Sequence, residues 1–319
     1  MSKFSEKTPK ECQKLAEDVR AAVGKVVIGK EDVTAKMLIC LLAGGHVLIE
    51  DVPGIGKTTI VNALARALDL SFQRIQFTPD LMPSDVTGFN MFNPKEGDFV
   101  FHEGAVSTQI LLADEINRSS PRTQSALLEA MQEGQVTVDG KTYDLPQPFM
   151  VLATQNPIEH VGTYPLPEAQ LDRFMMRISI GYPSKEDEMK IISLNASDRL
   201  KNDVKAVVDE KQLVELQKQV RFVKASEEMK DYVLTLCRKT REKEQVELGV
   251  SPRAGQMLLL AAAAHALLSG REYISPDDIQ ELAHDVLDHR LILKAQAKGS
   301  GMDSASIITE ILKETAAPK

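Results

Sequence analysis

The residues best suited to chemistry form a short glycine-rich stretch that follows an apolar segment and precedes a helical one. This stretch reads Asp51-Val-Pro-Gly-Ile-Gly-Lys-Thr-Thr59. In such a loop the backbone N–H groups converge with the N-terminus of the next helix, and both favour an anion. Lys57 would neutralise phosphate charge, and the hydroxyl of Thr58 would bind Mg²⁺. The pattern predicts a phosphate-binding loop, although its strict form has glycine at the position of Asp51.

Two adjacent carboxylates end a second apolar segment, Ile110-Leu-Leu-Ala-Asp-Glu115. A strand buried on both faces places its last side chains at the carboxyl edge of a parallel sheet, beside the phosphate loop. There Asp114 would hold Mg²⁺ through water, and Glu115 would orient and polarise an attacking water. Phosphoryl transfer needs mainly positioning and charge stabilisation. The two motifs together therefore predict an ATP hydrolase that uses ATP and Mg²⁺.

A third apolar segment ends in Thr154-Gln-Asn-Pro157. If this strand lies beside the acid-bearing one, the amide of Asn156 would hydrogen-bond the γ-phosphate or the attacking water. A simple turn before Pro157 is the alternative interpretation.

Alternating strands and helices must position these motifs. Apolar strands are expected at 46–50, 71–77, 110–113, 149–154 and 174–182, and helices at 11–43, 58–70 and 121–133. A pattern of this kind predicts an α/β domain with a mainly parallel sheet. Two hairpins are expected within it, one inserted at about 78–104 and one at about 135–144 that turns at Asp139-Gly140.

After Pro183 the strand signals stop and helical ones take over. Ser251-Pro252 and Ser275-Pro276 each combine a helix N-cap with a proline at the first helical position. The chain is therefore expected to consist of an α/β core at 1–183 and a smaller all-helical domain at 184–319.

Composition and charge narrow the class of protein. Apolar residues make up 43% of the 319 residues and the formal net charge is −8, which is typical of a globular protein without a nucleic-acid-binding surface. No apolar run reaches the length of a membrane span, and Met1 to Lys10 lack a secretory signal. Three widely spaced cysteines are expected to be reduced thiols, and the expected location is cytoplasmic.

Several motifs resemble the MoxR family of AAA+ ATPases, and the resemblance covers nearly the whole chain. They are Gly44-Gly-His46, the phosphate loop, Asp114-Glu-Ile-Asn-Arg118, Gln124-Ser-Ala-Leu-Leu-Glu-Ala-Met131, Ala153-Thr-Gln-Asn-Pro-Ile-Glu159 and Leu166-Pro-Glu-Ala-Gln-Leu-Asp-Arg-Phe174. The resemblance implies a P-loop AAA+ domain, a helical lid and a ring, normally a hexamer. It also implies a chaperone-like role in maturing protein complexes, with partners that carry von Willebrand factor A domains.

The same resemblance implies roles for individual residues. The nucleotide-binding residues would be Val27, Ile28, Gly29, Pro53, Gly54, Ile55, Gly56, Lys57, Thr58 and Thr59. Catalysis would involve Glu115, Asn156, an arginine finger at Arg173 and a second sensor arginine at Arg253, with Thr58 and Asp114 at the metal. On the residues alone, Arg173 is equally an arginine in a surface ion pair, and 27–29 an ordinary packed loop. Whether Arg253 serves its own subunit or a neighbour stays open.

Three functions remain after these motifs. The first is a MoxR-like ATPase that remodels protein partners. The second is an ATP-driven nucleic-acid translocase, since minichromosome-maintenance helicases share the inserted hairpins; the acidic charge argues against it. The third is a nucleotide-regulated scaffold with slow turnover, and the intact pair Asp114 and Glu115 argues against that. No nucleic acid and no membrane span are expected.

Overall fold

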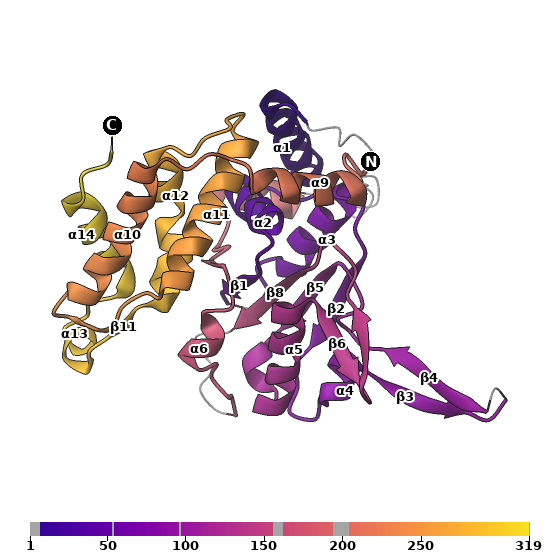
Figure 1. The fold of residues 1–319 in the computed structure, drawn as a ribbon. Coiled ribbons are helices and arrows are strands. Elements are labelled where there is room, and N and C mark those ends of the chain that lie inside the picture. The colour runs from indigo at the N-terminus through magenta and orange to yellow at the C-terminus, as the bar shows by residue number, and fades with distance from the viewer. Residues whose placement is uncertain (1–6, 53, 96, 156–161, 194–203, 319) are drawn as a thin grey trace.

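A five-stranded parallel sheet forms the centre of the part of the chain that the structure describes (Figure 1). The structure is a computed structural model, and it describes residues 7–52, 54–95, 97–155, 162–193 and 204–318. The strands of the sheet are β1 (Val47–Glu50), β2 (Phe72–Gln76), β5 (Ile110–Asp114), β8 (Met150–Gln155) and β9 (Met176–Ile178). Their order is β2-β5-β8-β1-β9, and every pair is parallel. The predicted α/β class with a parallel sheet is confirmed.

Both faces of the sheet are covered, as the continuous apolar strands require. In β5, Ile110 and Leu112 point into one core and Leu111 and Ala113 into the other, and all four are fully buried. The helices on the first face are α1 (Pro9–Gly24), α2 (Glu31–Leu42) and α3 (Lys57–Ala67). The second face is covered by α5 (Pro121–Glu133) and the short α4 (Pro83–Thr87).

Two antiparallel hairpins leave this core. The first pairs β3 (Gly88–Asn93) with β4 (Asp98–Glu103) and projects from the body of the protein (Figure 1). The second pairs β6 (Gln135–Val138) with β7 (Lys141–Asp144) and turns at Asp139-Gly140, both at positive φ. The rings of Phe101 and Tyr143 stack at 3.9 Å and join the two hairpins. Several apolar side chains along the first hairpin stay exposed: Phe89, Met91, Phe92 and Phe99.

Helices dominate the chain after β9. They are α7 (Lys185–Ser193), α9 (Glu210–Val220), α10 (Glu227–Glu242), α11 (Pro252–Leu268), α12 (Pro276–Leu287), the 3₁₀ turn η2 (Asp288–Arg290), α13 (Ala295–Gly299) and α14 (Ser304–Glu314). Ser251 caps α11 as predicted, because its hydroxyl accepts from the N–H of Ala254 at 3.2 Å. The prediction of purely helical structure was wrong in one detail: β10 (Val246–Leu248) and β11 (Ile292–Leu293) form a short antiparallel pair. This pair joins the ends of helices that are distant in sequence.

The N-terminal helix belongs to both parts of the fold. Helix α1 packs against α3 of the core and against α11, while α2 contacts α9 and α11 (Figure 1). Cys12, Cys40 and Cys237 are buried in this region and unpaired. Among the described residues, no helix combines the length and the apolarity that crossing a membrane needs. A domain boundary near 183 stays a prediction.

Candidate functional site

The phosphate loop leads directly from β1 into α3. Gly54 and Gly56 have φ of 85° and 88°, a backbone region that glycine adopts without strain. Gly56 is the N-cap of α3 and has no side chain to accept from the first N–H groups of the helix. These N–H groups are therefore available to an anion, and the helix dipole favours one there. Pro53 lies outside the described residues.

Lys57 begins α3, and its ammonium group donates to the backbone carbonyl of Asp51 at 2.8 Å. Burial lowers the pKa of Lys57, while the negative charges of Asp51, Asp114 and Glu115 act in the opposite direction. The lysine therefore lies within electrostatic reach of both acids that the sequence assigned to hydrolysis. The structure brings the loop and the acid pair together at one edge of the sheet, as predicted.

Asp51 stands where the strict loop pattern has glycine, and its carboxylate has a structural function. It accepts from the hydroxyl of Ser179 at 3.2 Å, from the N–H of Ile180 and from the N–H of Gly181 at 3.2 Å. The carboxylate thus fastens the chain that leaves β9 against the start of the phosphate loop. Lys30 holds the same segment from the other side by donating to the carbonyl of Ile180 at 2.6 Å. No local pattern indicated the contact between Asp51 and Ser179, which spans 128 positions.

The carboxylate of Asp114 is held by two side chains from neighbouring strands. Arg74 of β2 donates through Nε to Oδ2 at 2.6 Å, and the Thr154 hydroxyl of β8 donates to Oδ1 at 3.2 Å. Thr154 also accepts from the backbone N–H of Glu115 at 2.8 Å. A single threonine therefore fixes both acids, and neither it nor Arg74 was among the predicted site residues.

Glu115 adopts the left-handed backbone region, with φ 54° and ψ 50°. A non-glycine residue is rare there, and such residues gather at functional sites. Its carboxylate accepts from the amide of Gln76 at 2.8 Å and from Arg118 at 3.2 Å. The alternation of β2 was the one available signal for Gln76 and Arg74, because residues two apart share a face of the strand.

Strand β8 lies between β1 and β5, so its carboxyl end opens between the phosphate loop and the acid pair. The register pairs Gln155 with Glu50, and Asn156 is the next residue. Asn156 itself lies outside the described residues. The position of its strand agrees with the predicted role, which stays a prediction.

A pocket of about 610 Å³ adjoins the phosphate loop. Its apolar wall includes Val27 and Ile28, as predicted, and Ile60, Tyr182 and Ile192, which were not. Gly54, Ile55, Gly56 and Thr59 complete the side that faces the loop. An apolar cleft of this size beside an anion site is suited to a purine nucleotide.

Gly29 lies next to this pocket without lining it. Its φ is 70°, and a Cβ there would collide with the carboxylate of Asp187 in α7. The glycine therefore lets α7 approach closely, and α7 in turn supplies Ile191 and Ile192 to the pocket.

The two arginines assigned to catalysis lie elsewhere. Arg173 follows α6 (Glu168–Leu171) and donates to the carbonyl of Leu128 at 2.6 Å. Arg253 is exposed in the first turn of α11, and its charge acts on His46, which precedes β1 and so lies at the opposite edge of the sheet from the phosphate loop. Among the described residues that line the 610 Å³ pocket, none follows Ile192.

The donor set at the sheet edge fits a magnesium ion. Thr58 offers a hydroxyl in the first turn of α3, and Asp114 offers carboxylate oxygens. Mg²⁺ prefers oxygen ligands and normally keeps several waters and substrate phosphates in its shell. One hydroxyl and one carboxylate are therefore a sufficient protein contribution.

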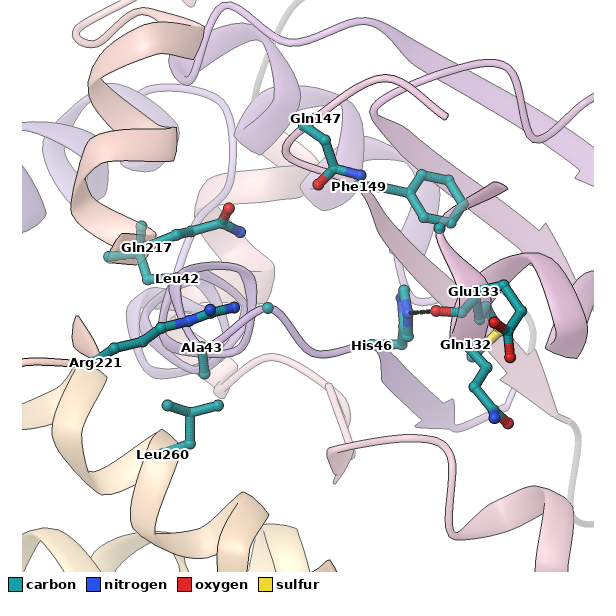
Figure 2. Close-up of a pocket in the computed structure, with 13 residues that line it drawn as sticks. Leu42, Ala43, His46, Gln132, Glu133, Gln147, Phe149, Gln217, Arg221 and Leu260 are labelled. Carbon is teal, nitrogen blue, oxygen red and sulfur yellow. Dashed lines mark hydrogen bonds between the residues drawn. The ribbon is translucent and has the colours of Figure 1, made fainter. Parts of the chain in front are cut away.

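A second, polar pocket of about 240 Å³ lies away from the phosphate loop (Figure 2). It is bordered by His46, by the end of α5, by Gln217 of α9 and by Arg221, which follows that helix. The ring of His46 accepts from the N–H of Val151 at 3.0 Å and donates to the carbonyl of Met131 at 3.0 Å. Burial lowers its pKa to about 4. A neutral histidine with both nitrogens bonded has a packing role here.

Comparison with known proteins agrees with this geometry. Residues 46–176 match the ATPase family associated with various cellular activities (AAA), and residues 238–311 match the AAA lid domain. The chain is 49% identical to the uncharacterized protein YeaC of Bacillus subtilis, over 93% of this chain and 92% of that protein. It is 41% identical to the chaperone MoxR1 of Mycobacterium tuberculosis, over 93% and 81%.

A crystal structure gives the same result. A protein from Cytophaga hutchinsonii, provisionally described as an ATPase, superposes with a TM-score of 0.89 at 41% identity. The superposition covers 98% of this chain and 97% of that one.

Proposed function

Because the chain belongs to the MoxR family of AAA+ ATPases, we propose that it binds Mg·ATP and hydrolyses it to remodel or mature complexes of partner proteins. The observation that carries this proposal is the meeting of Lys57, Asp114 and Glu115 at one sheet edge beside an apolar pocket of nucleotide size. A chaperone name among the relatives supports the remodelling role.

The geometry gives each residue a step. The base enters the pocket beside Val27 and Ile28, and the phosphates meet the uncapped N–H groups of α3. Lys57 leaves the carbonyl of Asp51 and turns its ammonium group to the β- and γ-phosphates. Thr58 and Asp114 would hold magnesium, which would supply charge neutralisation.

Glu115 orients a water for attack on the γ-phosphorus, and the bond from this phosphorus to the β–γ bridging oxygen breaks. The water's proton is released, and ADP and phosphate are the products. Before this step the carboxylate must exchange its bonds to Gln76 and Arg118 for the water. The amide of Asn156 is assigned to the γ-phosphate or the same water.

The active site is shared between subunits of a ring, which we take to be a hexamer. Arg173 donates to the carbonyl of Leu128 in α5, and the charge of Arg253 acts on His46 at the opposite edge of the sheet, which supports a role for both outside their own subunit's site. An arginine supplied by a neighbour stabilises the charge of the transition state and is worth about 10³–10⁵ in rate in related systems. We assign Arg173 this role, with Arg253 acting in trans beside it.

Partner proteins are expected to carry von Willebrand factor A domains, and the expected compartment is the cytoplasm. The exposed apolar tip of the β3–β4 hairpin supports a protein-binding role, since exposed apolar patches mark interaction sites. A nucleic-acid translocase would need a basic track, and the net charge of −8 disfavours one.

Phosphate release by the purified protein tests the proposal. Wild type should hydrolyse ATP with Mg²⁺, and Glu115→Gln should bind ATP with similar affinity yet turn over at least about 100-fold more slowly. Arg122→Gln, on the exposed start of α5, provides a surface control that should keep wild-type activity. Turnover of Glu115→Gln within about twofold of wild type would remove Glu115 from catalysis. Hydrolysis that rises on adding DNA, with salt-sensitive binding, would favour the translocase.

A further inference from the structure

One buried arginine of the lid binds the segment that carries Arg173 and also donates to the carbonyl of Val286 in α12. Arg290 ends η2, and its side chain is only 2% exposed. Its guanidinium donates to the carbonyls of Asp172 at 3.1 Å, Phe174 at 2.7 Å and Met175 at 3.2 Å. A planar guanidinium has five N–H donors in a fixed fork, so it holds these carbonyls in one orientation.

The carboxylate of Asp172 completes this contact. It accepts from Nε of Arg290 at 2.7 Å, and the hydroxyl of Ser251 lies 3.4 Å from its other oxygen. Ser251 is the N-cap of α11, the helix that carries Arg253 two residues later. Asp172, the residue before Arg173, is therefore bound to two elements of the lid, η2 and the N-terminus of α11.

Arg290 binds both residues that flank Arg173, and one of them is also fixed in the core. On one side, Phe174 is fully buried in the core beneath the sheet. On the other side, Asp172 is bound to the lid through Arg290. The guanidinium of Arg173 donates to Leu128 of α5, a contact that it must exchange for a phosphate when it serves a neighbour. A shift of the lid would therefore act on Arg173 through the backbone on both of its sides.

The lid also contacts α2, the helix that follows the pocket residues Val27 and Ile28 in the chain. Lys36 of α2 pairs with Asp285 of α12 at 2.9 Å, and α2 begins at Glu31, just after the pocket residues Val27 and Ile28. Helix α12 continues directly into η2 and Arg290. Helix α12, which leads into Arg290, is thus bound to α2, the helix that directly follows the pocket residues Val27 and Ile28.

We propose that Arg290 and Asp172 are a positioning pair that sets the arginine which one subunit offers to the ATP of its neighbour. The inference rests on the proposed function, in which Arg173 acts in trans. The pair does not touch nucleotide itself. Its effect is to make the orientation of Arg173 depend on where the lid lies.

Two variants test the pair. Arg290→Lys keeps the positive charge and loses the planar guanidinium. Asp172→Asn keeps the shape of the side chain and loses its negative charge. The second variant remains informative if the first folds poorly. Both should assemble and bind ATP within about twofold of wild type. We expect kcat to fall about 10- to 100-fold, because displacements near 1 Å have effects of that size on catalysis.

A matched control comes from another ion pair of the lid. Arg271 binds Asp278 at 2.7 Å, and this pair lies within the lid. Arg271→Lys makes the same chemical change in a less buried pair, so it should lower thermal stability and leave kcat near wild type. A fall in kcat equal to that of Arg290→Lys would show that general loosening of the lid explains the effect, and would overturn the proposal.

Mixed rings separate a positioning role from local damage. Lys57→Ala subunits lack a working phosphate loop but keep an intact Arg290 and Arg173. When they are mixed with Arg290→Lys or Asp172→Asn subunits, some interfaces join an intact loop to a correctly held arginine. Activity per intact loop should therefore recover towards wild type at those interfaces.

The parallel mixture of Arg173→Ala with Lys57→Ala distinguishes the two failures. In one outcome, ATPase activity recovers in this mixture but not in the mixtures with Arg290→Lys or Asp172→Asn, although subunits exchange in all of them. That outcome would overturn the positioning pair and leave the shared site standing. No recovery in either mixture would overturn the shared site, and the positioning pair with it. Full activity of both variants alone would also refute the pair.

Discussion

The guanidinium of Arg74 lies 2.6 Å from the carboxylate of Asp114, so the acid assigned to the metal ion is already paired within the protein. Arg74 is half exposed and Asp114 is 10% exposed, which places the pair at the rim of the sheet edge. A positive charge so close to a cation site must weaken the binding of the cation while it orients the ligand.

Arg74→Ala should therefore increase the apparent affinity for Mg²⁺. Solvent screens the exposed side of the pair, so the binding free energy of Mg²⁺ should change by only about 1 kcal/mol. The Mg²⁺ concentration that gives half-maximal hydrolysis should fall about three- to fivefold. Titration of Mg²⁺ in the phosphate-release assay measures it, with Arg122→Ala as the control. A higher requirement for Mg²⁺ would mean that orientation of Asp114 outweighs the charge effect.

Lys57→Ala should abolish useful nucleotide binding. The ammonium group would face several phosphate oxygens, and losing it should cost about 2–4 kcal/mol, which is roughly a 30- to 1,000-fold increase in Kd. Calorimetry with ATP gives the value directly. Unchanged affinity would place the phosphates away from this lysine.

Asp51→Ala should affect both stability and nucleotide binding. It removes the acceptor of three donors at 179–181 and leaves two backbone N–H groups unpaired near the pocket residues Tyr182 and Pro183. Bonds to charged acceptors contribute about 1.5–3 kcal/mol each and are not additive, so the expected loss is about 3 kcal/mol. Thermal unfolding with and without ATP tests this. A variant as stable as wild type would show that the bonds to Asp51 contribute little to the stability of the fold.

Arg173→Ala should bind ATP and assemble, yet hydrolyse ATP at least about 10³-fold more slowly. Wild-type activity per chain should rise with protein concentration as rings close. Activity of a dilute monomer equal to that of the ring would exclude a trans arginine. Light scattering run beside the assay reports the state of assembly.

Acid should destabilise the fold through His46. The folded protein takes up a proton on His46 only near pH 4, while the unfolded chain does so near 6.5, so the stabilising effect is complete above pH 6.5 and declines as the pH falls towards 4. The full contribution of His46 to the free energy of unfolding is roughly 3 kcal/mol, of which about 2 kcal/mol is lost by pH 5. His289, which is partly buried and whose pKa desolvation holds well below normal, adds to the same trend.

Chemical denaturation at pH values of about 7.5 and 5 measures this change. His46→Gln should be less stable at neutral pH but lose about 2 kcal/mol less on acidification than wild type. Equal losses in both proteins would assign the acid sensitivity to other groups.

Local patterns were enough to predict the sheet, the phosphate loop and the acid pair. Each depends on neighbouring residues, such as the apolar run that ends at Asp114 or the glycines that precede Lys57. The contacts that were missed join distant parts of the chain. Asp51 meets Ser179 across 128 positions and Arg290 meets Asp172 across 118. Their partners are chosen by tertiary packing, and no periodicity in one sequence records that choice.

The buried cysteines of this fold have a practical consequence. Burial raises the pKa of Cys12 and Cys237 to about 11 and that of Cys40 further, so the reactive thiolate is scarce at neutral pH. Maleimide dyes should therefore react slowly with the native chain. A cysteine introduced at Asn93, beside the tip of the exposed hairpin, would then carry a fluorophore almost alone. The wild-type background is suited to following single subunits as they join and leave an assembly.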